Sequence, residues 1–318
     1  MKETTRRTTD ATLSVIIVSD YAAGGDKAWN DLRKALHAWT TQDYRGPVEF
    51  VLAESSRHKQ EVPDDLRRLP PLFRNLYFDA GSSYELKNRA VEAVESEIVA
   101  IVDADCIPNR NWLRLLMATM NEHPEVVAVS GRTKYPGGTM LERILCLLTR
   151  SYLDPGRKGV IRFISGNAAG FRRKIYHRHL LPEGLGAFAS QIQSEAMLRD
   201  GCQFFFEPGM TVTHDFEGWG MERDIRRNHG YGTVITRLTD ERLPYAGLIR
   251  IGILAIPLIA LGKAIDSFRS CLRCWADYGL HWYELPVALT LIMVTHMLEI
   301  PGMLAAYRHV PNTETAFR

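Results

Sequence analysis

Hydrophobic residues in the first third of the chain fall into short, nearly uninterrupted runs. They are residues 13–19 (LSVIIVS), 48–53 (VEFVLA), 74–79 (RNLYFD) and 97–103 (EIVAIVD). Continuous apolar runs of this length, rich in β-branched side chains, are typical of strands that are buried on both faces of a parallel sheet. We therefore predict that these segments are strands of one sheet.

The segments between these runs have apolar residues at the spacing of a helix. The apolar residues of 29–39 (WNDLRKALHAW) recur on one helix face after Asp26, which is a predicted N-cap. Ser82 and Glu85 have the spacing of a capping box and begin a predicted helix that ends at Val94. Alternation of strands and helices predicts an α/β sandwich with a mainly parallel central sheet.

The middle of the chain continues this alternation. We predict helices at about 110–121 and 139–150, a strand at 126–131, and a strand, turn and basic helix within 160–176. A helix follows at 189–201, ended by Gly201, and two short strands at 203–208 and 210–214. The predicted globular domain therefore covers residues 13–240, after a polar tail at 1–12.

The pattern changes in residues 241–318, which we predict to be a membrane-associated helical region. Residues 251–262 are an apolar helix of roughly 18 Å, too short to cross a hydrocarbon core of about 30 Å. Residues 285–307 are long enough, but they include His296 and Glu299, which are costly inside a bilayer. We favour helices that lie in the membrane interface or form a shallow hairpin. Full spanning and two buried core helices remain alternatives.

Composition and charge limit the kinds of binding partner that we expect. The net charge is +2, and the basic clusters at 172–180 and 223–229 lack interleaved aromatic residues, so nucleic acid is not an expected partner. The five cysteines are scattered, as in proteins of a reducing compartment. Cys271 and Cys274 are predicted to be two thiols on one helix face, with a metal or redox role as the alternative. No signal-peptide core precedes residue 13, so we expect the protein in the cytosol.

Polar residues follow three of the predicted strands at their carboxyl ends. Asp103 and Asp105 end the run VAIVDAD, and Ser19, Asp20 and Glu54 follow the first two strands. Ligands of open α/β sheets bind beyond this edge. Two carboxylates there are hard oxygen ligands for Mg²⁺ or Mn²⁺, which would neutralise a diphosphate.

Several blocks of the sequence resemble the family 2 glycosyltransferases of GT-A fold. The blocks are SVIIVS, VEFVLAESS, LKNRAVEAVESEIVAIVDADCIPNRNWL and SGNAAGFRR, and the resemblance covers roughly residues 13–235. It implies an inverting enzyme that uses a nucleotide-diphospho-sugar. The apolar region after it is similar to the membrane-associated tail of bacterial members.

The resemblance also implies roles for individual residues. Asp103 and Asp105 match the family's DxD motif, with Asp105 as the stronger candidate for metal ligand. Lys87 and Asn88 stand at the place of an RN pair near the nucleotide, and Glu54 lies in the stretch that contacts the base. That stretch reads AESS here instead of the usual DDGS.

An inverting reaction needs a general base for the acceptor hydroxyl. Relatives provide it from an acidic pair at the start of the helix that here reads SQIQSEAMLRDG, where glutamines stand instead. Glu195 is the candidate base. Asp215 or Glu217 is the alternative, and a protein without a base, and so without catalysis, is another.

The remaining candidates lie in the second half of the domain. His214 matches a histidine near the metal and the diphosphate, with a structural role as the alternative. Arg226 and Arg227 match a basic helix that could hold the diphosphate or a lipid phosphate, with an ordinary solvated helix face as the alternative. Gly166 and Asn167 match the GN turn beside the acceptor site, with a purely structural turn as the alternative.

Together these features predict a sugar transferase at the cytoplasmic face of the inner (cell) membrane. It would move a sugar from a nucleotide-diphospho-sugar to a lipid-linked or polysaccharide acceptor. The alternative is a catalytically inactive nucleotide-binding protein at the membrane surface. A nucleotidyltransferase is disfavoured because residues 22–27 (AAGGDK) do not form the required phosphate loop.

Overall fold

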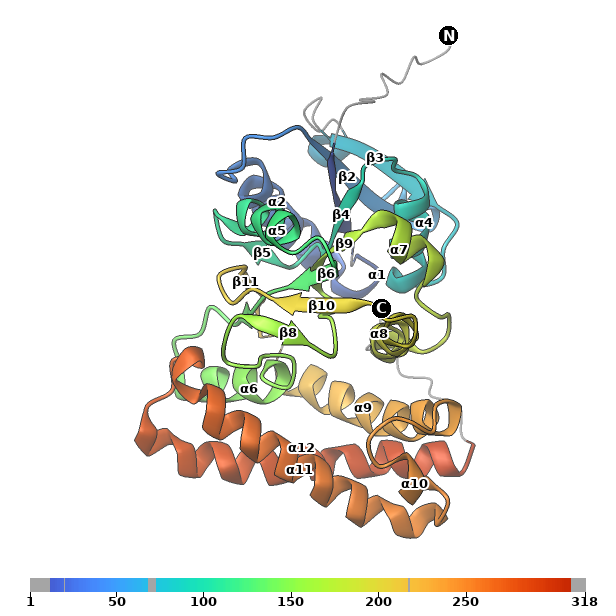
Figure 1. Cartoon of the computed structure of the whole chain (residues 1–318), viewed down its shortest axis with the longest axis vertical. Helices are drawn as coiled ribbons and strands as arrows, with labels where there is room; N and C mark the ends of the chain where they lie inside the picture. Colours follow the sequence, from blue (N-terminus) through green and yellow to red (C-terminus); the bar gives the residue numbers. More distant parts are fainter. Residues whose placement is uncertain (1–11, 20, 68–72, 217, 310–318) are drawn as a thin grey trace.

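The computed structural model describes residues 12–19, 21–67, 73–216 and 218–309. Its centre is an eight-stranded sheet with the order β3-β2-β1-β4-β9-β6-β10-β8 (Figure 1). The strands are β1 (Leu13–Val18), β2 (Val48–Ser55), β3 (Phe73–Phe78), β4 (Ile98–Asp103), β6 (Val126–Ser130), β8 (Gly159–Ile161), β9 (Ala168–Arg172) and β10 (Gln203–Phe206). Strands β9 and β8 run antiparallel to their neighbours, and the other pairs are parallel. The predicted mainly parallel sheet is confirmed.

Strand β1 lies between β2 and β4, and its side chains are all buried. This position explains its continuous hydrophobic run, because helices cover both of its faces. Val18 is in register with Ala53 of β2 and with Asp103 of β4. The polar residues that end these three strands therefore meet at one edge of the sheet.

Helices cover both faces of the sheet. α2 (Asp26–Thr40) and α5 (Trp112–Glu122) lie on one face, while α4 (Ser83–Glu92), α7 (Arg173–Arg178) and α8 (Ala189–Arg199) lie on the other. The buried rings of Trp39 and Trp112 join the first pair, edge to face. One local prediction is wrong. Gly25, with a φ of 54°, is the N-cap of α2, and Asp26 is its first residue, because glycine adopts this left-handed conformation at little cost.

A small second sheet was not predicted. It consists of β5 (Ile107–Pro108), β11 (Val212–Thr213) and β7 (Thr133–Lys134), in the order β5-β11-β7. Strand β11 lies within the strand predicted at 210–214, but β5 and β7 are too short to produce a hydrophobic pattern. It places the residues that follow Asp105 beside the residues that precede His214.

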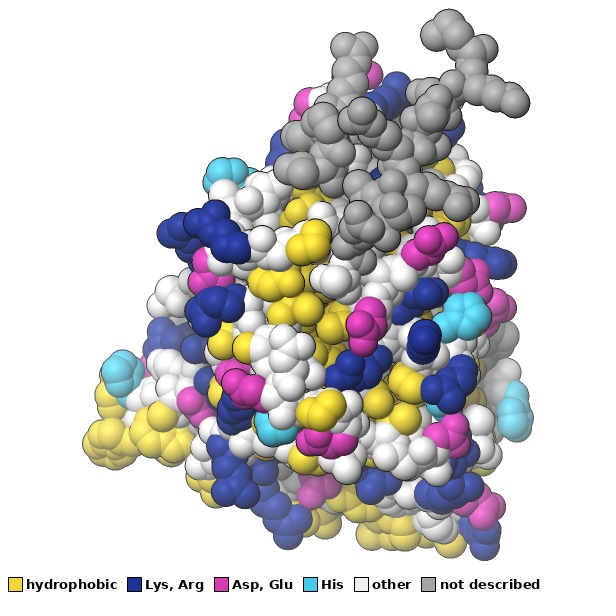
Figure 2. Space-filling model, turned by 45° about the horizontal axis from the view of Figure 1, so that its top comes forward, with side chains coloured by type: hydrophobic (Ala, Val, Ile, Leu, Met, Phe, Trp, Pro, Cys, Tyr) yellow, Lys and Arg dark blue, Asp and Glu magenta, His cyan; other side chains and the backbone are white. Residues whose placement is uncertain are grey.

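Below the sheet lies a layer of helices, at the bottom of Figure 1. The layer contains α9 (Trp219–Thr239), α10 (Ala246–Ile249), α11 (Ala255–Cys274) and α12 (Leu285–Tyr307), with α6 (Met140–Arg150) packed against it. The prediction for 285–307 matches α12, whereas α11 starts later and runs further than predicted. Hydrophobic side chains line the lower margin of the molecule, with Lys and Arg side chains above them (Figure 2).

One segment of the described chain, Trp282–Tyr307, is long and apolar enough to cross a membrane, judged by length and composition. Helix α12, which makes up most of it, packs closely on α9. A Cβ atom at Gly302 would lie 1.8 Å from the carbonyl oxygen of Arg227, and one at Gly230 would lie 1.8 Å from that of Glu299. Only glycine allows the two backbones to come this close.

The cysteines are all free thiols, and Cys271 and Cys274 are buried within α11. Burial raises the pKa of Cys271 to about 11. This agrees with the predicted structural role of the pair, since reactive thiols need a lowered pKa and access.

Candidate active site

The two aspartates lie on a turn that follows β4. The turn is held by backbone hydrogen bonds from Asp103 N to Asn167 O (2.9 Å), from Ala104 N to Val18 O (2.9 Å) and from Cys106 N to Asp103 O (3.0 Å). The neighbouring strand β1 and the loop before β9 thus position the carboxylates at the edge of the sheet.

Asp103 is paired with Lys87, a contact that was not predicted from the sequence. Lys87 lies on α4, is buried, and has its ammonium 2.7 Å from Asp103 Oδ1. It also donates to the carbonyl oxygen of Gly166 at 2.7 Å. Burial raises the pKa of Asp103, and the charge of Lys87 opposes this effect. Lys87 therefore connects α4 to the aspartate turn and to the loop around Gly166.

Asp105 is paired with His214. Asp105 Oδ2 lies 2.9 Å from His214 Nε2, and His214 Nδ1 lies 2.7 Å from the carbonyl oxygen of Asp215. Burial disfavours ionisation of Asp105, but the charge and hydrogen bond of His214 outweigh it and lower the pKa of Asp105. Burial likewise disfavours the charged form of His214, yet Asp105 raises its pKa. Asp105 Oδ1 is buried and has no hydrogen-bond partner among the residues that the structure describes.

These features fit a divalent metal ion. A buried carboxylate oxygen without a partner is costly, and Mg²⁺ and Mn²⁺ prefer carboxylate ligands. A carbonyl oxygen at Nδ1 directs Nε2 of His214 towards Asp105, which is a common arrangement for metal-binding histidines. No three His, Cys, Asp or Glu side chains of the described chain converge as a metal site. The protein would thus provide Asp105 and His214 and leave other coordination positions for the substrate.

The first two strands contribute Ser19 and Glu54. Ser19 Oγ donates a hydrogen bond to Glu54, and the N–H of Ser55 donates to the same carboxylate at 2.6 Å. Burial raises the pKa of Glu54, although these hydrogen bonds favour its ionised form. Asp20 lies outside the described residues. The structure thus confirms that Ser19 and Glu54 meet, while the binding of a nucleobase by Glu54 stays a prediction.

Two predicted asparagines have structural contacts. Asn167 Nδ2 donates to Thr133 Oγ1 at 3.0 Å, and its carbonyl holds the aspartate turn. Asn88 donates to Leu181 O at 2.9 Å and accepts from Leu181 N at 3.0 Å. The amide of Asn88 is thus used within the fold, away from Asp103.

A pocket of about 280 Å³, which includes its open mouth, lies next to Lys87. Gly166, Ser190 and Gln193 are among its lining residues. Glycine is needed here because a Cβ at position 166 would lie 2.5 Å from Ser190 Oγ. Helix α8 therefore presents a hydroxyl and an amide to this pocket, not carboxylates.

Glu195, the predicted base, lies further along α8. It is buried, and Arg162 donates to its Oε1 from Nε at 3.0 Å and from Nη2 at 2.9 Å. Arg162 itself is 56% exposed. Asp215 follows His214 directly, whereas Glu217 lies outside the described residues. The base role of Glu195 stays a prediction.

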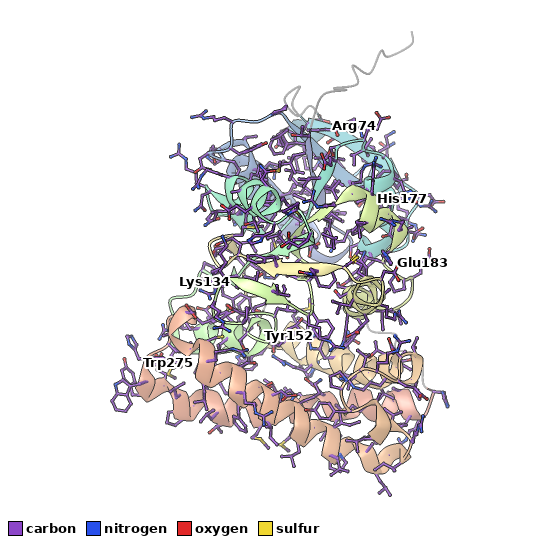
Figure 3. All side chains as sticks on the ribbon, viewed as in Figure 1. Arg74, Lys134, Tyr152, His177, Glu183 and Trp275 are labelled. Carbon is purple, nitrogen blue, oxygen red and sulfur yellow. The ribbon has the colours of Figure 1, made fainter. Side chains whose placement is uncertain are left out.

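Sequence reasoning missed Arg150, the last residue of α6. Its Nε is buried without a hydrogen-bond partner, and its charge contributes to the lowered pKa of Asp105 after the effects of burial and His214. Tyr152, two residues further on, lies between the sheet and the helical layer (Figure 3). A single arginine at the end of an apolar helix has no pattern that marks it as functional.

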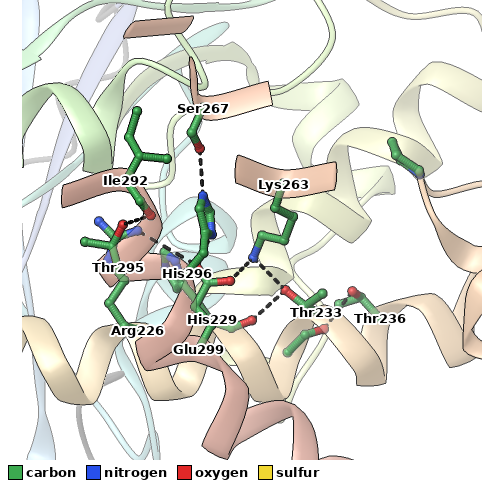
Figure 4. Close-up of polar contacts among 12 residues, drawn as sticks. Arg226, His229, Thr233, Thr236, Lys263, Ser267, Ile292, Thr295, His296 and Glu299 are labelled. Atoms are coloured by element: carbon green, nitrogen blue, oxygen red, sulfur yellow. Dashed lines mark hydrogen bonds and ion pairs between the residues drawn. The ribbon is translucent and has the colours of Figure 1, made fainter. Parts of the chain in front are cut away.

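Arg226 and Arg227 lie on α9. Arg226 is buried, with its Nε 2.7 Å from Glu222 and its Nη1 3.8 Å from Glu299 of α12 (Figure 4). Lys263 of α11 also pairs with Glu299. The structure thus places Arg226 in a cluster of charges between helices, without a described contact to Asp103 or Asp105. Arg227 is exposed.

Three comparisons place the fold among known proteins. Residues 25–180 match the model of glycosyl transferase family 2. Glycosyltransferase AglE of Haloferax volcanii is 27% identical over 119 residues, which are 36% of this chain and 39% of that protein. The mannosyltransferase PcManGT of Pyrobaculum calidifontis, solved with GDP-Man and Mn²⁺, aligns over 93% of this chain and 86% of its own, with 16% identity and a TM-score of 0.58. This chain therefore carries a family 2 glycosyltransferase domain of GT-A fold.

Proposed function

We propose that this protein transfers a sugar from a nucleotide-diphospho-sugar to an acceptor hydroxyl, with inversion at the anomeric carbon. The observation that carries the proposal is Asp105, whose second carboxylate oxygen is buried and unpaired beside His214 at the carboxyl edge of the sheet. The fold neighbour PcManGT, solved with GDP-Man and Mn²⁺, has the ligand chemistry that we propose here.

Asp105 and His214 would hold Mn²⁺ or Mg²⁺, which stabilises negative charge on the leaving diphosphate. The chain's own groups do the rest. Lys87 holds Asp103 and the Gly166 loop in place, so that the donor enters a preformed site. Ser19 and Glu54 form the next polar group along the same edge, where the nucleoside would lie.

The base must take a proton from the acceptor hydroxyl. We propose Glu195 for this role, and Asp215 is the alternative. Glu195 must first loosen its contacts with Arg162, whose exposed side chain can move away. A bell-shaped pH profile that loses its acidic limb in Glu195→Gln, but not in Asp215→Asn, supports this assignment.

The proposal is tested by turnover of nucleotide sugars with Mn²⁺. Release of nucleoside diphosphate should fall by about 100-fold or more in Asp105→Asn, because its charge is lost at the metal. Asp200→Asn is the matched control, since Asp200 is an exposed aspartate beyond the end of α8. Equal turnover by both variants would contradict the proposal.

A second candidate is a nucleotide-binding protein without transferase activity. The observation that favours it is the pocket-facing start of α8, where Ser190 and Gln193 stand and Glu195 is engaged by Arg162. Tight binding of a nucleoside diphosphate with Mn²⁺, without turnover of any donor, would support this candidate.

We also propose that the helical layer lies on a lipid membrane. Its outer side exposes large hydrophobic side chains, among them Leu254 at 76%, Trp282 at 73% and Met297 at 64%. His296 and Glu299 of α12 are buried, and Glu299 pairs with charged groups of α9 and α11. A helix held in this way is suited to the interface plane, with its apolar side towards lipid. A cytoplasmic site beside the membrane would suit a lipid-linked or polysaccharide acceptor.

A further inference from the structure

We propose that Arg150 is a phosphate-binding residue of this site, which contacts a phosphate group lying against Asp105. The inference rests on the proposed function and adds a residue for which the sequence offered no signal. The phosphate has two possible sources, the diphosphate of the donor and the phosphate of a lipid acceptor, which share the same recognition chemistry.

Arg150, which is half-buried, differs from the buried arginines of the described chain. Arg132 has its Nε 2.5 Å from Asp154, Arg226 has its Nε 2.7 Å from Glu222, and Arg237 donates to two carbonyl oxygens. The Nε of Arg150 is buried without an acceptor, and no ion pair joins Arg150 to any residue that the structure describes. A buried N–H group without an acceptor is costly, so this nitrogen is suited to an anionic ligand.

The position of Arg150 follows from its neighbours on α6. Thr149 Oγ1 lies 3.2 Å from the hydroxyl of Tyr135, and the ring of Tyr135 lies 6.1 Å from that of His214. His214 is in turn 2.9 Å from Asp105. The last turn of α6 is therefore held next to the metal-binding pair.

Arg150 and Asp105 have opposite charges but do not form an ion pair with each other. Each has a buried atom without a partner, the guanidinium Nε and the carboxylate Oδ1, and they do not pair with each other. A phosphate bound between them would satisfy Arg150 directly and Asp105 through its metal ion.

The chain just after Arg150 is accessible. Tyr152, two residues further on, is 62% exposed and lies between the sheet and the helical layer (Figure 3).

The test uses the full chain and binding, not turnover. Calorimetric titrations with Mn²⁺ compare GDP and UDP with the corresponding nucleosides, and a second set compares farnesyl phosphate with farnesol in detergent. The variants are Arg150→Met, Arg150→Lys and the control Arg157→Gln, an exposed arginine on the next loop. Thermal unfolding without ligand shows whether each variant is folded.

We expect Arg150→Met to weaken one phosphate ligand by about 10- to 100-fold, because a charge-assisted hydrogen bond is lost. Arg150→Lys should retain part of the affinity, and Arg157→Gln all of it. Weaker GDP or UDP binding identifies the donor diphosphate, whereas weaker farnesyl phosphate binding alone identifies a lipid phosphate. Unfolding of ligand-free Arg150→Met should not be easier than that of the wild type, since Arg150 has no partner to lose.

Unchanged binding of both phosphate ligands in Arg150→Met would overturn the inference and leave the proposed function intact. A clear loss of ligand-free stability in this variant would also overturn it, since Arg150 would then be a structural residue. Wild-type protein that binds no nucleoside diphosphate and no lipid phosphate would remove the proposed function and the inference together.

Discussion

At the residue scale, the charges of the site form two pairs with different chemistry. The buried Lys87 forms an ion pair with Asp103, which fixes that carboxylate in place. His214 contacts one oxygen of Asp105 and leaves the other without a partner. Asp103 is therefore suited to positioning and Asp105 to ligand binding, as expected if Asp105 is the stronger candidate for metal ligand in the DxD motif.

We predict that Lys87→Met destabilises the protein by about 3 kcal/mol, because it leaves the Asp103 carboxylate without its buried partner. Nucleoside diphosphate binding should weaken as the turn loses its support. Chemical denaturation and calorimetry measure both effects. Lys174→Met is the control, since Lys174 is exposed on α7. Equal stability of the two variants would contradict the role given to Lys87.

A second prediction concerns His229 on α9. Burial, followed by the charge of Arg226, lowers the pKa of His229 to about 3 from its ordinary value of 6.5. Between pH 6.5 and 3 the unfolded chain therefore binds a proton that the folded chain does not. The stability that this group contributes is present above pH 6.5 and is lost as the pH falls through that window.

Replacement by glutamine should remove this pH dependence, which amounts to at most about 1.4 kcal/mol per pH unit. Denaturation of wild type and His229→Gln at a series of pH values between 4 and 7 measures the difference in slope. His177→Gln, at an exposed position on α7, should follow the wild type. Parallel curves for wild type and His229→Gln would contradict the assigned pKa.

At the element scale, the closest packing joins α9 to α12. Gly230 and Gly302 allow the two helix backbones to touch, and Glu299 pairs with Arg226 and Lys263 at the same crossing. The backbone contact sets the distance between the helices. The buried charges favour one register, because a shifted helix would leave Glu299 buried without a partner. Helix α12 is thus held along its length by α9, which begins a few residues after His214.

We predict that Gly302→Ala destabilises the protein by about 1–3 kcal/mol, since the added methyl group would lie 1.8 Å from Arg227 O. Gly247→Ala on α10 is the matched control, because nothing lies within 4 Å of a Cβ there. That change should be neutral or slightly stabilising, as alanine favours helices. Urea denaturation compares the two. Equal midpoints would show that α9 and α12 can separate without cost.

At the scale of the whole molecule, helix α6 connects the proposed active site to the apolar helical layer. It carries Arg150 near the proposed metal ligands Asp105 and His214, and it packs through Ile144, Leu147 and Leu148 in the core shared with α11 and α12. Arg132 connects the same parts through Asp154 and Asp277. A membrane under the helical layer would therefore hold the site at a defined height above the lipid.

Membrane binding can be tested with vesicles. We predict that the protein sediments with phosphatidylcholine vesicles, also at high salt, because the contact is mainly apolar. Replacement of Leu254, Leu258 and Leu261 by serine should weaken binding about tenfold or more. Val160→Ser on β8 removes an equally exposed apolar residue from another surface and should have no effect. Unchanged vesicle binding by the triple variant would show that this face of the helical layer is not the membrane-binding surface.

Much of the fold could be predicted from local pattern. The hydrophobic runs identified the central strands, and residues 285–307 identified α12. Because the carboxyl ends of parallel strands share one edge, the positions of Ser19, Glu54 and Asp103 followed from topology. Strand β11 lies within the predicted strand 210–214, whereas the two-residue strands β5 and β7 could not be predicted, since they are too short for a periodic signal.

The sequence by itself therefore determined the layers of this protein and the edge where its acidic residues gather, because burial leaves a local, periodic record along the chain. Tertiary structure alone decided how the side chains are used. It joined Asp105 to His214, engaged Asn88 with Leu181 and Glu195 with Arg162, and left the Nε of Arg150 without an acceptor in the described part of the chain. These contacts connect positions far apart in the chain, and only the packing of the helices on the sheet determines which of them form.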